Sequence, residues 1–240
     1  MLSTPKAVAI LALVSGAAPV RALLEPRIIT FDSSPGALKL DATPTIIVDA
    51  QDFPGVHIAA EALARDFERV TGVDRDADTP AVLKLNTSLT SLASPSLDAN
   101  ASAIVIGSLT NSPLITSLVD AGKLNVSAIE GQWESFTSSV VDGLGSTIPS
   151  TRALVIVGSD KRGTIFGTYT LSEQLGVSPW YWWADVPIPH RPNPIYALPE
   201  TTIHGPPSIK YRGIFLNDES PALNTWVQDT LGTENGKFTR

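Results

Sequence analysis

The chain has 240 residues, a formal net charge of −7 and no cysteine, and 43% of its residues are hydrophobic. This length allows one sizeable domain and part of a second, and burial must stabilise both because no disulfide can form. The lack of cysteine also excludes thiolate nucleophiles and cysteine-ligated metals. The acidic balance, without any basic run, disfavours nucleic acid and anionic membrane surfaces as partners.

The first residues differ in composition from the rest of the chain. Lys6 gives a short basic start, residues 7–18 are apolar and mostly small, and Val20-Arg21-Ala22 resembles a small-residue cleavage site. We therefore predict a signal peptide over residues 1–22 and a secreted, extracellular protein. An N-terminal membrane anchor is the alternative, which is disfavoured because the apolar run is shorter than the roughly 20 residues that a membrane span needs.

Asn86, Asn100 and Asn125 each begin an Asn-x-Ser sequon in polar surroundings. A sequon in a secreted protein is a potential acceptor of an N-linked glycan on a surface loop. The three together predict a glycoprotein.

Residues 23–177 are predicted to form an α/β domain with a mixed sheet. Short β-branched or apolar runs bounded by turn residues predict strands at 27–31, 38–40, 45–48, 81–85, 103–108, 133–141 and 153–159. Apolar residues at helical spacing, with capping residues, predict helices at 57–71, from Ser112-Pro113 to Gly122, and at 164–175.

Residues 178–206 are rich in proline and aromatic residues, so we predict an extended connector that cannot lie in a helix or a central strand. The adjacent aromatic residues at 180–183 could stack on sugar rings, but packing between domains is the favoured interpretation. Asp185 behind them is expected to cap a turn, with substrate binding as the alternative. We place a domain boundary near Pro206.

Two other features have weak functional interpretations. The turn at residues 158–164 has the shape of a phosphate loop but lacks its lysine, so Lys161 and Arg162 could at most hold a carboxylate, and structural pairing is favoured. The three histidines, His57, His190 and His204, have no metal-ligand spacing and are interpreted as surface or packing residues.

Residues 210–219 carry the strongest candidate site. Lys210 to Asn217 is predicted as a buried strand, and Asn217, Asp218 and Glu219 follow directly at its end. Ligands gather beyond the carboxyl ends of such strands, so these polar groups suggest a site. A loop that binds its own backbone is the alternative.

Two strings of sequence, KRGTIFGTYTLSEQLGVSPWYWWADVP (161–187) and GPPSIKYRGIFLNDE (205–219), closely resemble glycoside hydrolase family 115, the xylan α-1,2-glucuronidases. The resemblance implies an N-terminal α/β domain, similar to the accessory domain of hexosaminidase-type glycosidases, followed by a (β/α)8 barrel whose first strand is residues 210–217. It also implies removal of glucuronic acid or its 4-O-methyl ether from xylan, with inversion and without a metal or organic cofactor.

By this resemblance, Asp218 is the first candidate for a catalytic residue and Glu219 the second. Asn217 beside them, and Asp185 after the aromatic run, are candidates for binding glucuronoxylan. The role of Asp218 stays open between binding a substrate hydroxyl and acid/base work. Family members are several hundred residues longer, which implies that residues 207–240 begin a truncated barrel and that the chain alone is inactive. The resemblance allows a homodimeric full-length enzyme. A carbohydrate-binding module and a purely structural accessory module are the alternatives.

Overall fold

The computed structural model describes residues 26–76, 80–86, 102–144, 152–191, 194–215, 217 and 221–232. The predicted signal peptide and the sequon asparagine Asn100 lie outside these residues. The chain divides into two compact units, Met1–Pro206 and Pro207–Arg240, which are described separately. None of the described helices is both long and apolar enough to span a bilayer.

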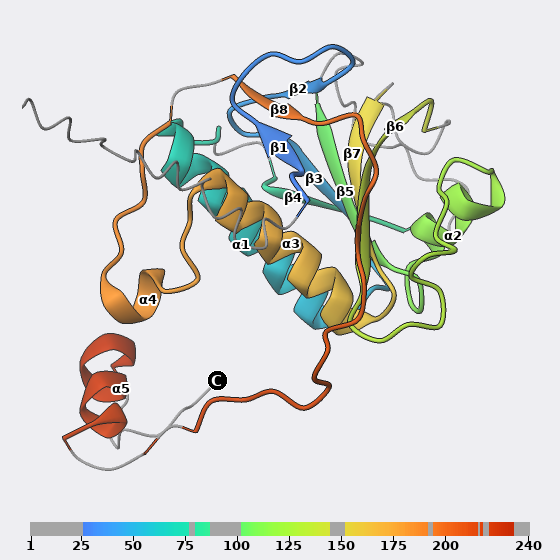
Figure 1. Cartoon of the computed structure of the whole chain (residues 1–240). Coiled ribbons are helices and arrows are strands. Elements are labelled where there is room, and N and C mark those ends of the chain that lie inside the picture. The colour runs from blue at the N-terminus through green and yellow to red at the C-terminus, as the bar shows by residue number, and fades with distance from the viewer. Residues whose placement is uncertain are drawn as a thin grey trace, which may run out of the picture. The chain divides into compact units, whose positions relative to one another are not determined.

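The first unit is built on a six-stranded sheet with the order β4-β3-β5-β7-β6-β9 (Figure 1). The first four of these strands are parallel, β6 is antiparallel to β7, and β9 is antiparallel to β6. The predicted mixed sheet is therefore confirmed. Its strands are β3 (Thr45–Asp49), β4 (Val82–Leu85), β5 (Ala103–Ser108), β6 (Phe136–Asp142), β7 (Arg152–Gly158) and β9 (Thr202–His204).

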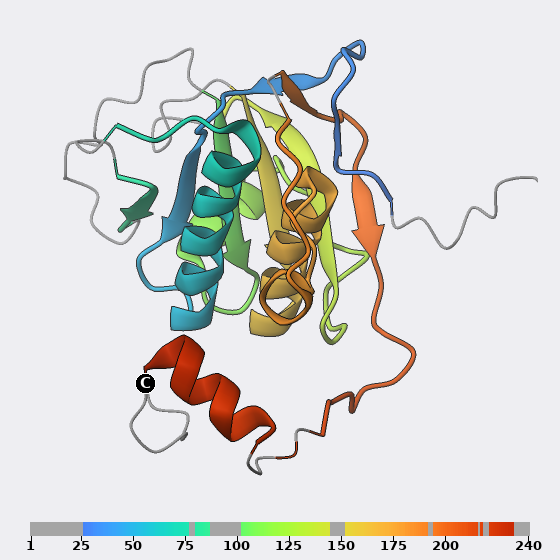
Figure 2. The ribbon, with the colours of Figure 1, turned by 90° about the vertical axis from the view of Figure 1, so that its left-hand side faces the viewer.

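Helices cover both faces of this sheet. Helices α1 (Pro54–Thr71) and α3 (Lys161–Leu175) lie side by side on one face, and α2 (Pro113–Asp120) lies on the other (Figure 2). Because side chains alternate along a strand, Ile46 of β3 packs into the core under α1 and α3 while Ile47 packs into the core under α2. This two-sided burial explains why the parallel strands are apolar at nearly every position.

The helix termini follow local capping chemistry. Helix α1 begins at Pro54, earlier than expected, since proline suits the first helical position. Helix α3 begins before the expected Thr164 because Oδ1 of Asp160 accepts a hydrogen bond from Gly163 N at 2.7 Å. Ser112 caps α2 as predicted, accepting from Ile115 N at 3.3 Å.

The prediction that the proline-rich connector contains no helix and no central strand is wrong in both parts, because residues 181–184 form a one-turn helix and residues 195–197 form a central strand. Strand β8 (Ile195–Ala197) is the middle strand of a second sheet with the order β1-β8-β2, and β9 is part of the main sheet. Pro194 and Pro199 flank β8 without entering it, so its backbone N–H groups remain free to pair with both neighbours. The remaining elements of this unit are β1 (Ile29–Thr30), β2 (Leu38–Leu40) and the one-turn helix α4 (Tyr181–Ala184).

In the described part of the second unit, regular structure is confined to helix α5 (Leu223–Leu231). Of the strand expected over residues 210–217, the described residues 210–215 and 217 form none, and Tyr211, Ile214 and Phe215 are 88%, 76% and 93% exposed. A buried parallel strand needs neighbours for its backbone groups on both sides, and no described strand pairs with this segment. Its apolar sequence is therefore not matched by burial.

Candidate functional site

The structure describes only part of the predicted site at the end of residues 210–219. Asn217 is exposed and lies outside any helix or strand. Asp218 and Glu219 lie outside the described residues. The expected convergence of these three side chains therefore remains a prediction, without the strand that was expected to precede them.

Asp185 lies directly after α4 with a φ of 48°, in the left-handed region that aspartate tolerates better than most residues. Its exposed side chain and its place at the helix end agree with the expected role in a turn. The aromatic residues before it do not share one environment. Tyr181 packs against the core cluster with the Arg69 guanidinium 5.3 Å above its ring, whereas Trp180 is 56% exposed. A flat row of exposed rings is therefore not formed by these two residues.

Arg162, in the first turn of α3, pairs with an acidic residue of the first unit. Arg162 Nε lies 2.9 Å from Oε1 of Glu134, whose side chain is only 10% exposed, and the guanidinium also lies over the Phe166 ring at 5.5 Å. The second carboxylate oxygen of Asp160 accepts from Glu134 N at 2.9 Å, which ties the same loop to the helix. The favoured interpretation, structural pairing, is confirmed for Arg162.

Two buried aspartates that the sequence analysis did not single out organise the carboxyl edge of the sheet. Asp49, the last residue of β3, accepts hydrogen bonds from Gln51 N at 2.9 Å and from Leu114 N at 3.0 Å. Asp52 accepts from Ser108 N and from Ser108 Oγ, both at 2.8 Å. The two carboxylates thus join the loop after β3 to the loop after β5. In the sequence, the only local indication of this network was an acidic residue, Asp49, directly after the β-branched run at residues 45–48.

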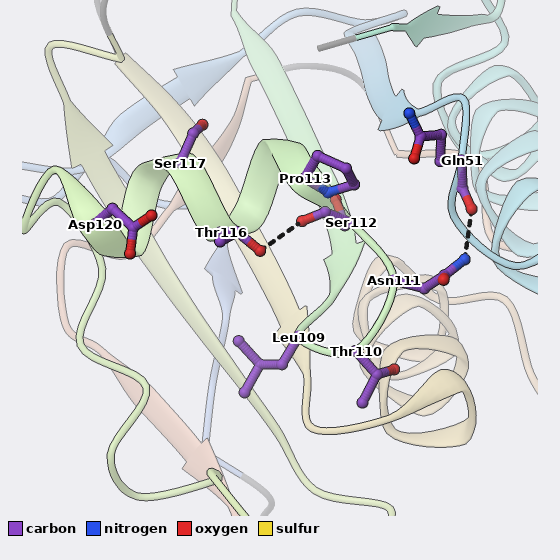
Figure 3. A pocket seen from close by; sticks show the side chains of 9 residues that line it. All are labelled: Gln51, Leu109, Thr110, Asn111, Ser112, Pro113, Thr116, Ser117 and Asp120. Carbon is purple, nitrogen blue, oxygen red and sulfur yellow. Dashed lines mark hydrogen bonds between the residues drawn. The ribbon is translucent and has the colours of Figure 1, made fainter. Parts of the chain in front are cut away.

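A pocket of about 440 Å³ lies at this edge (Figure 3). Strand β3 leads to α1 on one face of the sheet, and the adjacent parallel strand β5 leads to α2 on the other, which makes the position between them a topological switch point. Crevices at such points are common ligand sites in α/β proteins. The pocket is lined by Gln51, Leu109, Thr110, Asn111, Ser112, Pro113, Thr116, Ser117 and Asp120.

The pocket is lined mainly by polar side chains, without the pair of carboxylates that glycoside hydrolysis uses. Its hydroxyl and amide groups bind neighbouring backbone: Thr116 Oγ1 donates to Ser112 O at 3.2 Å, and Asn111 Nδ2 donates to Gln51 O (Figure 3). Asp120 is the only carboxylate among the lining residues, whereas glycoside hydrolysis uses a pair. The N–H groups of Leu114 and Ile115 are already bound by Asp49 and Ser112, so the start of α2 offers an anion few free donors.

The histidines lie apart in packing positions. His57 Nε2 lies 3.1 Å from Asp52 O, and the His190 ring lies against Gly72. His204, on β9, stacks on Phe136 with ring centroids 4.0 Å apart. Within the described ranges, no three His, Asp or Glu residues lie close enough together to hold a metal ion.

His204 makes the stability of the first unit depend on pH. Burial lowers the pKa of His204 below its usual 6.5, and its Nε2 is buried without a hydrogen-bond partner among the described residues. The unfolded chain therefore binds the proton more readily, so the stabilisation is complete above about pH 6.5 and is lost as the pH falls. We expect the urea midpoint to fall between about pH 7.5 and about pH 5, and to fall less in His204→Phe, which keeps the ring stack. An equal fall in both proteins would contradict this role.

Comparison with known proteins adds a family relationship. The profile of glycosyl hydrolase family 115 matches residues 204–240, which include Asn217, Asp218 and Glu219. A search of curated protein sequences gave no match. Among solved structures, a family GH115 4-O-methyl-α-glucuronidase with specificity for decorated arabinogalactans is similar with a TM-score of 0.56 and 26% sequence identity.

The similarity to that glucuronidase covers 81% of this chain and 21% of the enzyme, so the chain spans about a fifth of the enzyme's length. Two further structures are similar at lower TM-scores. CpGH84D has a TM-score of 0.46 and 11% sequence identity, and the similarity covers 85% of this chain and 27% of the CpGH84D chain. A Flavobacterium johnsoniae chitobiase, FjGH20, has a TM-score of 0.42 and 14% sequence identity, and the similarity covers 85% of this chain and 23% of the chitobiase chain. The profile match and the glucuronidase structure relate this chain to glycosyl hydrolase family 115.

Proposed function

We propose that the chain is the N-terminal part of a secreted, inverting α-glucuronidase that removes glucuronic acid or its 4-O-methyl ether from xylan. The observation that carries this proposal is the family match over residues 204–240, because this segment contains the adjacent carboxylates of Asp218 and Glu219. The similarity of the glucuronidase over 81% of the chain supports it. The first unit then serves as an accessory domain of the hexosaminidase type, and residues 207–240 as the start of a catalytic barrel.

The proposed chemistry needs two carboxyl groups. In an inverting glycosidase one carboxylic acid protonates the leaving oxygen and one carboxylate activates water, with the two held about 6.5–9.5 Å apart. Neighbouring residues such as Asp218 and Glu219 do not normally supply both, because water must enter on the opposite face of the sugar. We therefore assign at most one of the two roles to this pair. Asn217 and Asp185 are proposed to bind hydroxyl groups of the polysaccharide.

The experiment compares two proteins on two substrates. The 240-residue chain and the protein encoded by the longest transcript of its gene are incubated with glucuronoxylan and with a glucuronate-decorated arabinogalactan, the class named for the similar glucuronidase. We expect the longer protein to release the uronic acid from glucuronoxylan and the 240-residue chain to release none. Proton NMR of the first product should show the β anomer, because inversion of an α-linkage produces it.

Each other outcome corrects a defined part of the proposal. Release from arabinogalactan alone would overturn xylan as the substrate, and the α anomer as the first product would overturn inversion. Release by the 240-residue chain itself would overturn its proposed inactivity. A longer protein that is folded, as shown by circular dichroism, but inactive on both polymers would overturn the glucuronidase assignment.

A further inference from the structure

We propose that Asn125 is N-glycosylated in preference to Asn100, because the folded chain keeps both functional residues of the Asn125 sequon at the surface. Asn125 and Ser127 are both exposed, in the connection between α2 and β6. Oδ1 of Asn125 accepts a hydrogen bond from Ser127 Oγ at 2.8 Å and another from Ser127 N at 3.1 Å. The two functional residues of the sequon are thus already in contact in the folded chain.

The folded chain holds this sequon at the surface. Both hydrogen bonds from Ser127 go to Oδ1 of Asn125, so Nδ2 is not used to hold the turn. The hydrophobic neighbours Leu124 and Val126 are 7% and 9% exposed and anchor the turn to the core under α2. Asn125 is therefore held at the surface in one orientation, where a transferase can reach it.

The turn does not need the group that would be modified. In the transfer, Nδ2 of Asn125 forms a bond to C1 of the sugar, the bond from C1 to the pyrophosphate of a lipid-linked oligosaccharide breaks, and Nδ2 loses one proton to a base of the transferase. The lipid pyrophosphate leaves with the electron pair. Oδ1 keeps both hydrogen bonds from Ser127, so the structural role of Asn125 and its modification are compatible.

The described serine of the Asn100 sequon has a different environment. The hydroxyl-bearing residue of the Asn100 sequon is Ser102, which is only 4% exposed. Its Oγ donates to Oδ2 of Asp41 at 2.9 Å and accepts from Asp41 N at 2.8 Å. A transferase that recognises the sequon hydroxyl cannot reach Ser102 once the chain has folded. Asn86 is exposed, and its sequon serine lies outside the described residues.

The test is expression in a eukaryotic secretory host, with residues 1–22 replaced by a leader of that host. This proposal rests on the secretory route proposed above. The host leader lets the two proposals fail separately: a chain that is glycosylated when it carries the host leader, but not when it carries residues 1–22, overturns only the predicted signal peptide. Peptide mass spectrometry after peptide N-glycosidase treatment in heavy-oxygen water measures the occupancy of each sequon. We expect most copies to be modified at Asn125 and fewer at Asn100.

Matched variants distinguish the sequon from a general loss of folding. Ser127→Ala should abolish the glycan at Asn125, and Ser127→Thr should retain it because the hydroxyl is kept. Asn125→Asp should also abolish it while keeping the acceptor oxygen, and therefore the secreted yield. Secreted wild-type chain that is unmodified at Asn125, or occupancy at Asn100 equal to that at Asn125, would overturn the proposal.

Discussion

Asp52→Ala is expected to lower the free energy of unfolding of the first unit by about 2–5 kcal/mol, because the variant leaves buried donors without an acceptor, each at a cost of about 1–3 kcal/mol. Asp52 is 3% exposed and Ser108, which donates to it from both its backbone N and its hydroxyl, is fully buried. Ser108 Oγ in turn accepts from Asn111 N at 3.2 Å, so the loss should extend to the loop that lines the pocket. Urea unfolding followed by far-UV circular dichroism measures the change.

Two variants control this measurement. Asp52→Asn keeps the shape of the side chain but places an amide donor against a donor from Phe53 or Ser108, so its stability should lie between wild type and Asp52→Ala. Asp120→Ala removes an exposed carboxylate from the same pocket and should change stability by less than about 0.5 kcal/mol. A loss below about 1 kcal/mol in Asp52→Ala would show that water replaces the carboxylate and that the network is not essential.

The elements of the first unit could be predicted because their signals are local. The helix at 57–71 has a periodic apolar face, and Ser112-Pro113 and Gly122 mark the two ends of α2 within a few residues. The strands at 45–48 and 103–108 are short apolar runs between turn residues, and the sheet buries them on both faces. In each case the side chains that specify the element are also those that form its core.

The second sheet and the aspartate network could not be predicted in this way. β8 was hidden by the prolines around it, and its partners β1 and β2 lie far away in the sequence. Asp49 binds the start of α2 across a separation of 65 residues, so no spacing rule links the two. The carboxylate at a strand end is informative only once the sheet order shows which loop lies beside it.

The segment at residues 210–217 shows the opposite error, since its composition predicted burial that the structure does not show. Apolar side chains indicate that a segment can be buried, but the neighbours that would bury it are specified elsewhere. Ile214 and Phe215 therefore identify a surface that needs a partner, without identifying the partner. The candidate site follows this segment directly, so activity measurements on variants of Asp218 test it.

Asp218→Asn, in the protein encoded by the longest transcript, is expected to lower kcat on glucuronoxylan about 10²–10⁴-fold if Asp218 transfers a proton, because this is the usual contribution of a general acid or base. Asparagine has nearly the same shape but cannot exchange a proton at neutral pH. The variant should also lose one limb of the pH profile of kcat/KM. Initial rates of uronic acid release across the pH range measure both effects, and Glu219→Gln serves as the matched neighbour.

The same variant separates the two roles left open for Asp218. If its carboxylate only binds a substrate hydroxyl equally in the ground state and the transition state, Asp218→Asn raises KM and leaves kcat and its pH profile unchanged. If Glu219 is instead the proton-transferring residue, Glu219→Gln loses the pH limb and Asp218→Asn keeps it. Wild-type kcat/KM in both variants would exclude the pair from catalysis, and the proposed catalytic carboxylates would then have to be sought outside residues 204–240.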